Sequence, residues 1–229
     1  MDTYSVNSFI QFHEVIQTSF RKGTIFRGVA DIESHKLIPS IGRFLPAYIK
    51  NGYDKETLLL HEGFALRLFA AECVSYLSVA PKNKWELLAL AQHHGLPTRL
   101  LDWSYNPLVA LYFAVEQSVD RDSAVYALFT NEFIDDQLVE TLDPFEVKGV
   151  RAVMSAHVSP RIRAQGGLFT IQPDPTKPLE AENLAQIKIA KESKEEIMKT
   201  LLGYGIHRKT LFPDLDGLAA WIKQLRFFD

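Results

Sequence analysis

The spacing of hydrophobic residues predicts mostly helices in the first half of the chain. Apolar residues recur every three or four positions, which is typical of helices that bury one side, over residues 8–20, 54–78 and 85–93. Asn7 or Ser8 carries the side-chain oxygen that would cap the first of these helices. A further helix is predicted to begin at Pro107, because proline is favoured at the first helical position.

Short apolar or alternating runs predict strands that are separated along the chain. They occupy residues 24–29, 124–130, 168–171 and 184–190. Two more helical patterns cover residues 194–202 and 217–225. Helices gathered in the N-terminal half, with short strands around and after them, indicate an α+β fold and not a doubly wound parallel sheet.

The composition is that of an ordinary globular protein, with 229 residues, 47% of them hydrophobic and 23% charged. This length fits one large or two small domains, and we predict a single domain over residues 1–229. The N-terminus lacks the basic start and apolar core of a signal peptide, and no apolar run reaches about 18 residues. A cytoplasmic protein that does not engage the membrane is therefore expected.

Charge and cysteine content exclude several classes of site. The formal net charge of −3 argues against a broad basic face for nucleic acid, although a local groove stays open. The single Cys73 excludes an internal disulfide and a zinc site with several cysteines. The chain has no His-x-x-x-His or His-Glu-x-x-His spacing, so no metal site is predicted.

The stretch from Ala91 to Glu116 gathers more polar side chains than a core segment would hold. Burying an unpaired polar group costs about 1–3 kcal/mol, so such groups bond one another, face water or hold a ligand. We interpret the stretch as one wall of a ligand cleft. Its polar residues between the two apolar runs are His93, His94, Thr98, Arg99, Asp102, Ser104 and Asn106.

Several roles are open for these residues. His94 could act as a general base, a metal ligand or a donor to a ribose. Adjacent histidines on a helix point about 100° apart, so at most one of His93 and His94 easily faces the cleft. Asp102 could orient a histidine, or pair with Arg99 as a structural clamp.

Two other segments carry candidate binding groups. Arg27 ends a predicted strand beside Gly28, where a guanidinium could bind phosphate and a glycine would let a ligand approach the backbone. A surface ion pair is the plainer interpretation of Arg27. Later in the chain, Gln165 precedes a Gly166-Gly167 turn that would expose backbone N–H groups, or would simply form a hairpin turn.

These segments together resemble a known family. Phe26-Arg27-Gly28, the sequence AQHHGLPTRLLDWSYNPLVALYFA, the sequence RIRAQGGLFT and residues 211–215 resemble the FRG domain, a family of bacteria and phages named after the tripeptide. The resemblance runs from about Phe9 to the C-terminus. The family does not by itself fix an activity.

The chain is more distantly similar to mono-ADP-ribosyltransferases of the Arg-Ser-Glu type. In those enzymes an aromatic-Arg-Gly strand, a Ser- or Thr-bearing strand before a helix, and an acidic residue before a late strand occur in this order. Here Arg27, then Thr98 or Ser104, then Gln165 take these places. The resemblance implies a split antiparallel sheet that grips NAD, with Arg27 on a phosphate or ribose oxygen and the Gly28 backbone on the nicotinamide amide.

The same resemblance implies that Thr98 or Ser104 binds the ribose, with Arg99 as a further candidate for holding NAD. Gln165 departs from the pattern, because a glutamate there would place a full charge near the cation that forms. Two unit charges ~4 Å apart interact by roughly 4 kcal/mol at an effective dielectric of ~20, which is about a thousandfold in rate. Either Asp102 supplies the charge, or the site is slow, or it binds without turnover.

The expected function is therefore that of an ADP-ribosyltransferase-like enzyme with NAD as substrate, in a toxin or phage-defence setting. It would modify a protein or nucleic acid, or cleave NAD, with Arg27, Asp102, Gln165 and His94 as candidate catalytic residues. A nucleotide-sensing or partner-binding module without turnover is the alternative that Gln165 favours. A hydrolase or nuclease that uses His94 and Asp102 is a third.

Overall fold

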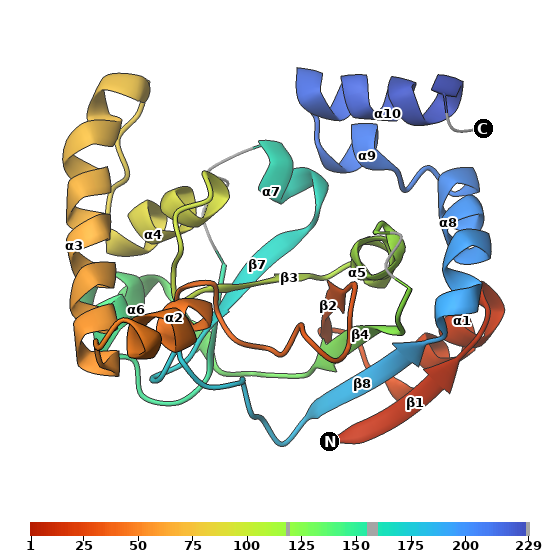
Figure 1. Ribbon diagram of the computed structural model, residues 1–229, viewed down its shortest axis with the longest axis horizontal. Coiled ribbons are helices and arrows are strands. Elements are labelled where there is room, and N and C mark those ends of the chain that lie inside the picture. The colour runs from red at the N-terminus through yellow and green to blue at the C-terminus, as the bar shows by residue number, and fades with distance from the viewer. Residues whose placement is uncertain (118–119, 155–159, 228–229) are drawn as a thin grey trace.

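A computed structural model describes residues 1–117, 120–154 and 160–227. Within these residues one eight-stranded sheet has the order β1-β8-β4-β2-β3-β7-β6-β5 (Figure 1). The central pairs are antiparallel, as predicted, whereas β1 with β8 and β5 with β6 at the two edges are parallel, which makes the sheet mixed. The strands are β1 (Asp2–Val6), β2 (Ile25–Val29), β3 (Leu101–Ser104), β4 (Ser123–Leu128), β5 (Phe133–Ile134), β6 (Arg151–Val153), β7 (Gly167–Ile171) and β8 (Leu184–Ile189).

The helices confirm the predicted pattern and add short ones that it did not predict. The Ser8 side chain caps the first helix by accepting from the Gln11 N–H (3.3 Å), and Asn106 caps the helix that begins at Pro107. None of the described helices is long and apolar enough to cross a bilayer. The helices are α1 (Phe9–Ser19), α2 (Leu45–Lys50), α3 (Lys55–Cys73), α4 (Lys84–His93), α5 (Pro107–Val115), α6 (Asp136–Thr141), α7 (Pro160–Ala164), α8 (Lys194–Gly203), α9 (Arg208–Leu211) and α10 (Leu215–Phe227).

The sheet is almost divided between β2 and β3. These two strands share a single residue pair, Phe26 with Ser104. Were the ladder to continue, Gly28 would lie opposite Asp102, but β2 instead stays paired with β4 along its whole length while β3 stays paired with β7. The central, antiparallel part of the mixed sheet is therefore almost split between β2 and β3, whereas the resemblance to ADP-ribosyltransferases implies a sheet that is antiparallel throughout.

Two groups of helices cover one face of the sheet on either side of the split. On the β2 side, α1, α5, α8 and α9 pack against Phe26 and its neighbours on β4 and β8. On the β3 side, α3 and α4 pack against Phe169 and Ile171 of β7. Figure 1 shows these groups to the right and left of the sheet. On the opposite face a continuous apolar cluster joins both halves through Ile25 and Trp103, which holds the split sheet together from behind.

Gly28 allows the close contact between β2 and α5. A Cβ atom at this position would lie 1.9 Å from the Ala110 backbone oxygen and 2.7 Å from the Ala114 nitrogen. The sequence suggests that Gly28 lets a ligand approach the backbone closely. In the structure it is the backbone of α5 that approaches Gly28 closely, although Gly28 also lines the cavity described below.

Gly28→Ala is therefore expected to lower the free energy of unfolding by about 1–3 kcal/mol, because overpacking against fixed backbone atoms forces strands or helices apart. Chemical denaturation measures this loss. Gly203→Ala is the matched control, since nothing lies within 4 Å of its added Cβ. That change adds a better helix former and should leave stability equal or higher. A Gly28→Ala protein as stable as wild type would contradict the packing role.

Candidate functional site

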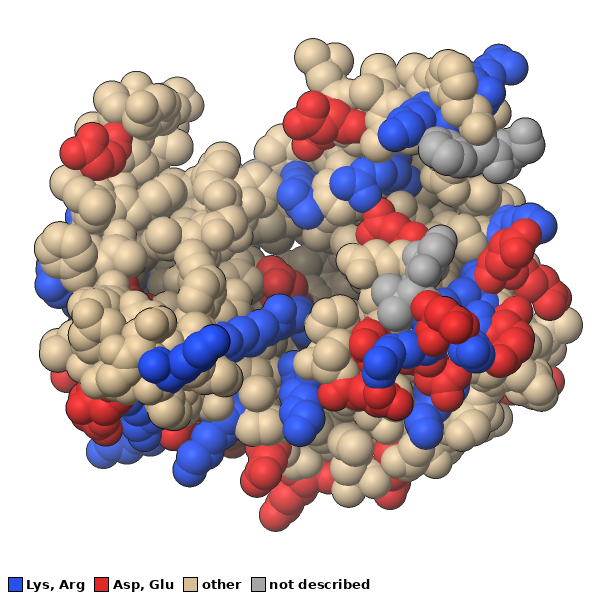
Figure 2. All heavy atoms as spheres, in the orientation of Figure 1, with Lys and Arg blue, Asp and Glu red and all other residues tan. Residues whose placement is uncertain are grey.

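A cavity of about 390 Å³ opens where the sheet is split, between the two helical groups. Figure 2 shows its mouth as a hollow near the middle of the face, with Lys and Arg side chains above and below it. Segments distant in sequence form its walls: β2, β3, the ends of α4 and α5, α7, and the loop that leads to Arg43. Of the predicted site residues, Arg27, Gly28, Asp102, Ser104 and Gln165 line this cavity together.

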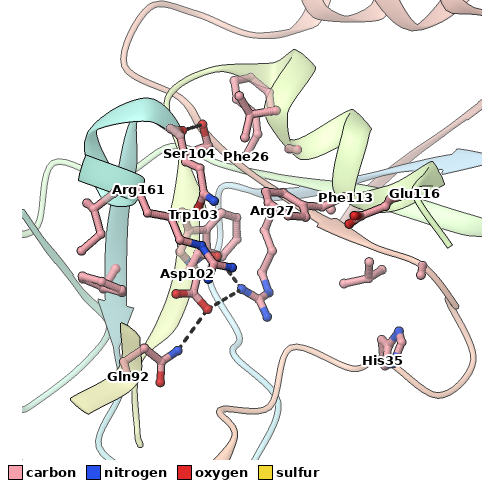
Figure 3. A pocket seen from close by; sticks show the side chains of 18 of the residues that line it. Phe26, Arg27, His35, Gln92, Asp102, Trp103, Ser104, Phe113, Glu116 and Arg161 are labelled. Carbon is pink, nitrogen blue, oxygen red and sulfur yellow. Dashed lines mark hydrogen bonds and ion pairs between the residues drawn. The ribbon is translucent and has the colours of Figure 1, made fainter. Parts of the chain in front are cut away.

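Arg27 occupies the gap that the split leaves beside β3. Its Nη1 atom donates to the backbone oxygen of Asp102 at 2.5 Å and lies 3.5 Å from the Asp102 carboxylate (Figure 3). The guanidinium therefore bonds to the strand end at the point where the missing ladder would have continued. Only 16% of the Arg27 side chain is exposed, against 60% for Asp102, so the acid faces the open cavity more than the base does.

Asp102 is the carboxylate around which three guanidinium groups gather. Besides Arg27, Arg43 and Arg161 both line the cavity, and Figure 3 shows Arg161 approaching from α7. Burial lowers the pKa of both Arg43 and Arg161, and the nearby Asp102 charge acts in the opposite direction on each. Guanidinium groups remain protonated at neutral pH all the same. Gln92 completes the ring by donating from Nε2 to Asp102 Oδ2 at 3.0 Å.

Positive charge exceeds negative charge in this cavity, although the whole chain is acidic. Four Lys or Arg side chains line it against two acids, Asp102 and Glu116. Glu116 is already paired with Arg208. Among the described residues Arg43 and Arg161 form no ion pair: Arg43 donates to the Ile38 backbone oxygen at 2.9 Å, and Arg161 lies over the Phe212 ring at 4.1 Å. Arg43 is exposed and Arg161 is partly buried, and both cations favour an anionic ligand in the cavity.

Aromatic and apolar groups form the rest of the lining. Phe26 comes from β2 and Phe113 from α5, where Phe113 meets the Phe212 ring edge-on at 6.1 Å. Phe169 lines the cavity from β7. A cavity that combines flat apolar walls with a few fixed charges suits a ligand with aromatic and anionic parts.

Ser104 and Gln165 meet in the cavity lining, near α7. The Ser104 hydroxyl donates to the Gln165 backbone oxygen at 2.6 Å and accepts from the Asn106 N–H at 2.9 Å. The Gln165 side chain donates from Nε2 to the Leu211 backbone oxygen at 3.1 Å. The following Gly166 has a φ of +55°, so the Gly pair does form the predicted tight turn. Both polar side chains thus also tie β3, α7 and α9 together.

Thr98 and Arg99 lie outside the cavity lining. Thr98 is 1% exposed, and its hydroxyl donates to the Gln92 side-chain oxygen. Arg99 is also buried and forms a two-pronged ion pair with Glu62 of α3, with N–O distances of 3.0 and 2.5 Å. The clamp between Arg99 and Asp102, one of the alternatives that the sequence left open, does not form, because Glu62 is the partner of Arg99 and Arg27 is the partner of Asp102.

Only one of the two adjacent histidines faces the cavity, as the helix geometry predicts, but it is His93 and not the candidate His94. His93 lines the cavity and is the last residue of α4. His94 is exposed, follows as the C-cap residue, and packs its ring edge-on against His93 at 4.9 Å. Burial, together with the charges of His94 and Arg161, lowers the pKa of His93, so its ring is mainly neutral at pH 7. The sequence favours His94 as the histidine of the site. In the structure His93, and not His94, lines the cavity together with Asp102.

Sequence reasoning did not single out several residues that line the cavity. Arg43 lies in a segment without a motif, which the structure shows as a short 3-10 helix (Ile41–Phe44). Gln92 appeared only as part of a helix. Arg161 was noted in RIRAQGG but was given no place in the site. Glu116, at the end of α5, was taken only as the end of the polar stretch. The signal that could have found Gln92 is its position directly before His93, at the start of the polar stretch.

Comparison with known proteins supports the family resemblance. Residues 22–123 match the model of the FRG domain. No curated protein and no solved structure gives a match. The matched range contains β2, β3 and α5, together with Arg27, Arg43, Gln92 and Asp102 of the cavity. Residues 22–123 are therefore similar to the FRG domain family.

Proposed function

We propose that the cavity binds NAD and that the protein cleaves its bond between ribose and nicotinamide. The observation that carries this proposal is the convergence of Arg27, Arg43 and Arg161 on Asp102 at the split in the sheet. Guanidinium groups suit phosphate oxygens, and the two without an ion pair would neutralise a diphosphate. The aromatic walls would hold the flat rings at either end of such a ligand.

The chemistry requires a negative charge near the ribose. When the bond from ribose C1′ to the nicotinamide nitrogen breaks, nicotinamide leaves with the electron pair and C1′ acquires oxocarbenium character. Water, or an oxygen or nitrogen atom of an acceptor, then attacks C1′ and loses a proton. Asp102 is the cavity acid that would stabilise this cation, because Glu116 is held by Arg208 and Gln165 carries no charge.

The direct test is incubation of the purified protein with NAD, followed by chromatography of nicotinamide and ADP-ribose. A parallel incubation with radiolabelled NAD and cell lysate separates transfer to a macromolecule from hydrolysis. The proposal predicts release of nicotinamide that Arg27→Ala removes. A folded wild-type protein that releases no nicotinamide and labels nothing would overturn it.

A second function, nucleotide sensing without turnover, is favoured by Gln165. The residue that takes the place of the expected acid is an amide, and its Nε2 is engaged with Leu211 of α9. A ligand that breaks this hydrogen bond on entering the cavity would shift α9 and the helix that follows it. Calorimetry with NAD and ADP-ribose separates the two functions, since binding without product selects the sensor.

Both functions predict that the two arginines without ion pairs control affinity. Arg43→Ala and Arg161→Ala should each weaken ADP-ribose binding about 10- to 100-fold, because hydrogen bonds to charged groups contribute roughly 1.5–3 kcal/mol. Titration calorimetry at two salt concentrations measures the loss, and the wild-type affinity should fall as salt rises. Arg163→Ala is the matched control, as Arg163 is an exposed residue of α7 outside the lining. Equal effects of all three substitutions would contradict the diphosphate role.

A further inference from the structure

A chain of hydrogen bonds runs from a backbone amide to the carboxylate of Asp102. The Leu100 N–H donates to the Thr98 hydroxyl oxygen at 3.2 Å. That hydroxyl donates to Gln92 Oε1 at 2.6 Å, and Gln92 Nε2 donates to Asp102 Oδ2 at 3.0 Å (Figure 3). Each of these groups therefore has one neighbour that fixes its direction.

The order of donors and acceptors in this chain allows only one orientation of the Gln92 amide. The Leu100 N–H can only donate, so the Thr98 oxygen accepts there and its own hydrogen is available to donate to Gln92 Oε1, while the Asp102 carboxylate can only accept from the amide NH₂ group. If the amide were turned over, its oxygen would face the carboxylate oxygen of Asp102, and two acceptors would meet. The Gln92 NH₂ group is thus directed at Asp102.

The far end of the chain is fixed in the protein interior. Thr98 is 1% exposed, its backbone N–H donates to the Ser40 hydroxyl at 2.9 Å, and its backbone oxygen accepts from the Ile41 N–H at 3.1 Å. The segment that contains Ser40 and Ile41 continues to Arg43, which lines the cavity. Thr98 is therefore fixed in place and connects through hydrogen bonds both to Asp102, by way of Gln92, and to the segment that carries Arg43.

Asp102 needs such support because packing does not hold it. Its side chain is 60% exposed, and an exposed carboxylate with a single ion pair can take several rotamers. The side-chain contacts of Asp102 with Arg27 and with Gln92 both use Oδ2. Among the described residues Oδ1 has no hydrogen-bond partner, so this oxygen remains for a ligand.

We propose that Gln92 is a positioning residue, oriented by Thr98, that holds Asp102 by Oδ2 so that Oδ1 faces the bound ligand. The effect on turnover rests on the proposed function, in which Asp102 stabilises the developing cation. The effect on the Asp102 rotamer does not depend on it.

Two substitutions break the chain at different points. Gln92→Met keeps the volume of the side chain but removes the amide hydrogen bonds to Thr98, Asp102 and the Leu100 backbone oxygen. Thr98→Val removes the hydroxyl. Each should lower kcat for nicotinamide release about 10- to 100-fold, with KM within about twofold of wild type, because the ligand contacts remain. Thr98→Ser keeps the hydroxyl and is expected to retain wild-type kcat.

Crystal structures of the same variants provide a readout without turnover. In wild type and Thr98→Ser the Asp102 carboxylate should occupy one rotamer, and in Gln92→Met and Thr98→Val it should move or take several. A fall in kcat with Asp102 unmoved, or a moved Asp102 with kcat unchanged, would overturn the inference. If wild type releases no nicotinamide, the proposed function fails, and the rotamer alone then decides: an unmoved Asp102 in both variants would refute positioning by Gln92.

Discussion

Asp102→Asn is expected to lower kcat for nicotinamide release about a thousandfold. The substitution keeps the shape of the side chain and an oxygen that accepts from Gln92, but it removes the charge. Two unit charges ~4 Å apart interact by roughly 4 kcal/mol at an effective dielectric of ~20, and each 1.36 kcal/mol corresponds to about tenfold in rate. The loss should appear in kcat and not in the affinity for ADP-ribose, which has no cationic centre at C1′.

Steady-state rates of nicotinamide release and calorimetry with ADP-ribose measure the two effects separately. Asp136→Asn, which changes an acid in the first turn of α6 and outside the cavity, is the matched control and should behave as wild type. A decrease in kcat of less than about tenfold for Asp102→Asn would remove Asp102 from the proposed role. Glu116 would then be the cavity acid to test.

Arg99→Leu is expected to lower the free energy of unfolding by about 3–5 kcal/mol. Arg99 and Glu62 are 5% and 2% exposed at their side chains, and the guanidinium also lies over the Phe145 ring at 4.2 Å. Removing one partner leaves a buried charge without compensation, and this is costly. Since the pair joins α3 to the start of β3, its loss should loosen one wall of the cavity as well.

Urea denaturation measures the loss, and two further variants test its cause. The double change Glu62→Leu with Arg99→Leu leaves no buried charge and should recover much of the lost stability. Arg151→Leu breaks an ion pair with Glu132, whose side chain is 63% exposed, and should change the free energy of unfolding by no more than about 1 kcal/mol. Equal losses for Arg99→Leu and Arg151→Leu would contradict the buried-charge explanation.

Local patterns in the sequence predict most of the longer elements. Ser8 and Asn106 cap helices, as their side chains predict. The α+β class follows from the order of helices and strands. The strand β3 is different, because its four residues alternate too briefly to be distinguished from a turn. The first strand, β1, is held by its parallel pairing with β8, which lies some 180 positions later. Such pairing leaves no local signal.

The site was predictable in its segments but not in its pairings. The polar stretch, the Arg27 strand and the RIRAQGG turn do meet at one cavity. The sequence does not predict which polar groups pair with one another. Arg99 pairs with Glu62, which lies on a helix 37 positions earlier, and Asp102 pairs with Arg27. Similarly, the place of a histidine on the last turn of α4 depends on how that helix is rotated against β3. Tertiary packing sets that rotation.

A crystal structure of the wild-type protein with ADP-ribose or NAD bound tests the central claim most directly. The account predicts that the diphosphate lies among Arg27, Arg43 and Arg161, with the nicotinamide-side ribose beside Asp102. Ligand density elsewhere on the molecule, or an empty cavity in crystals soaked at saturating ligand concentration, would contradict it.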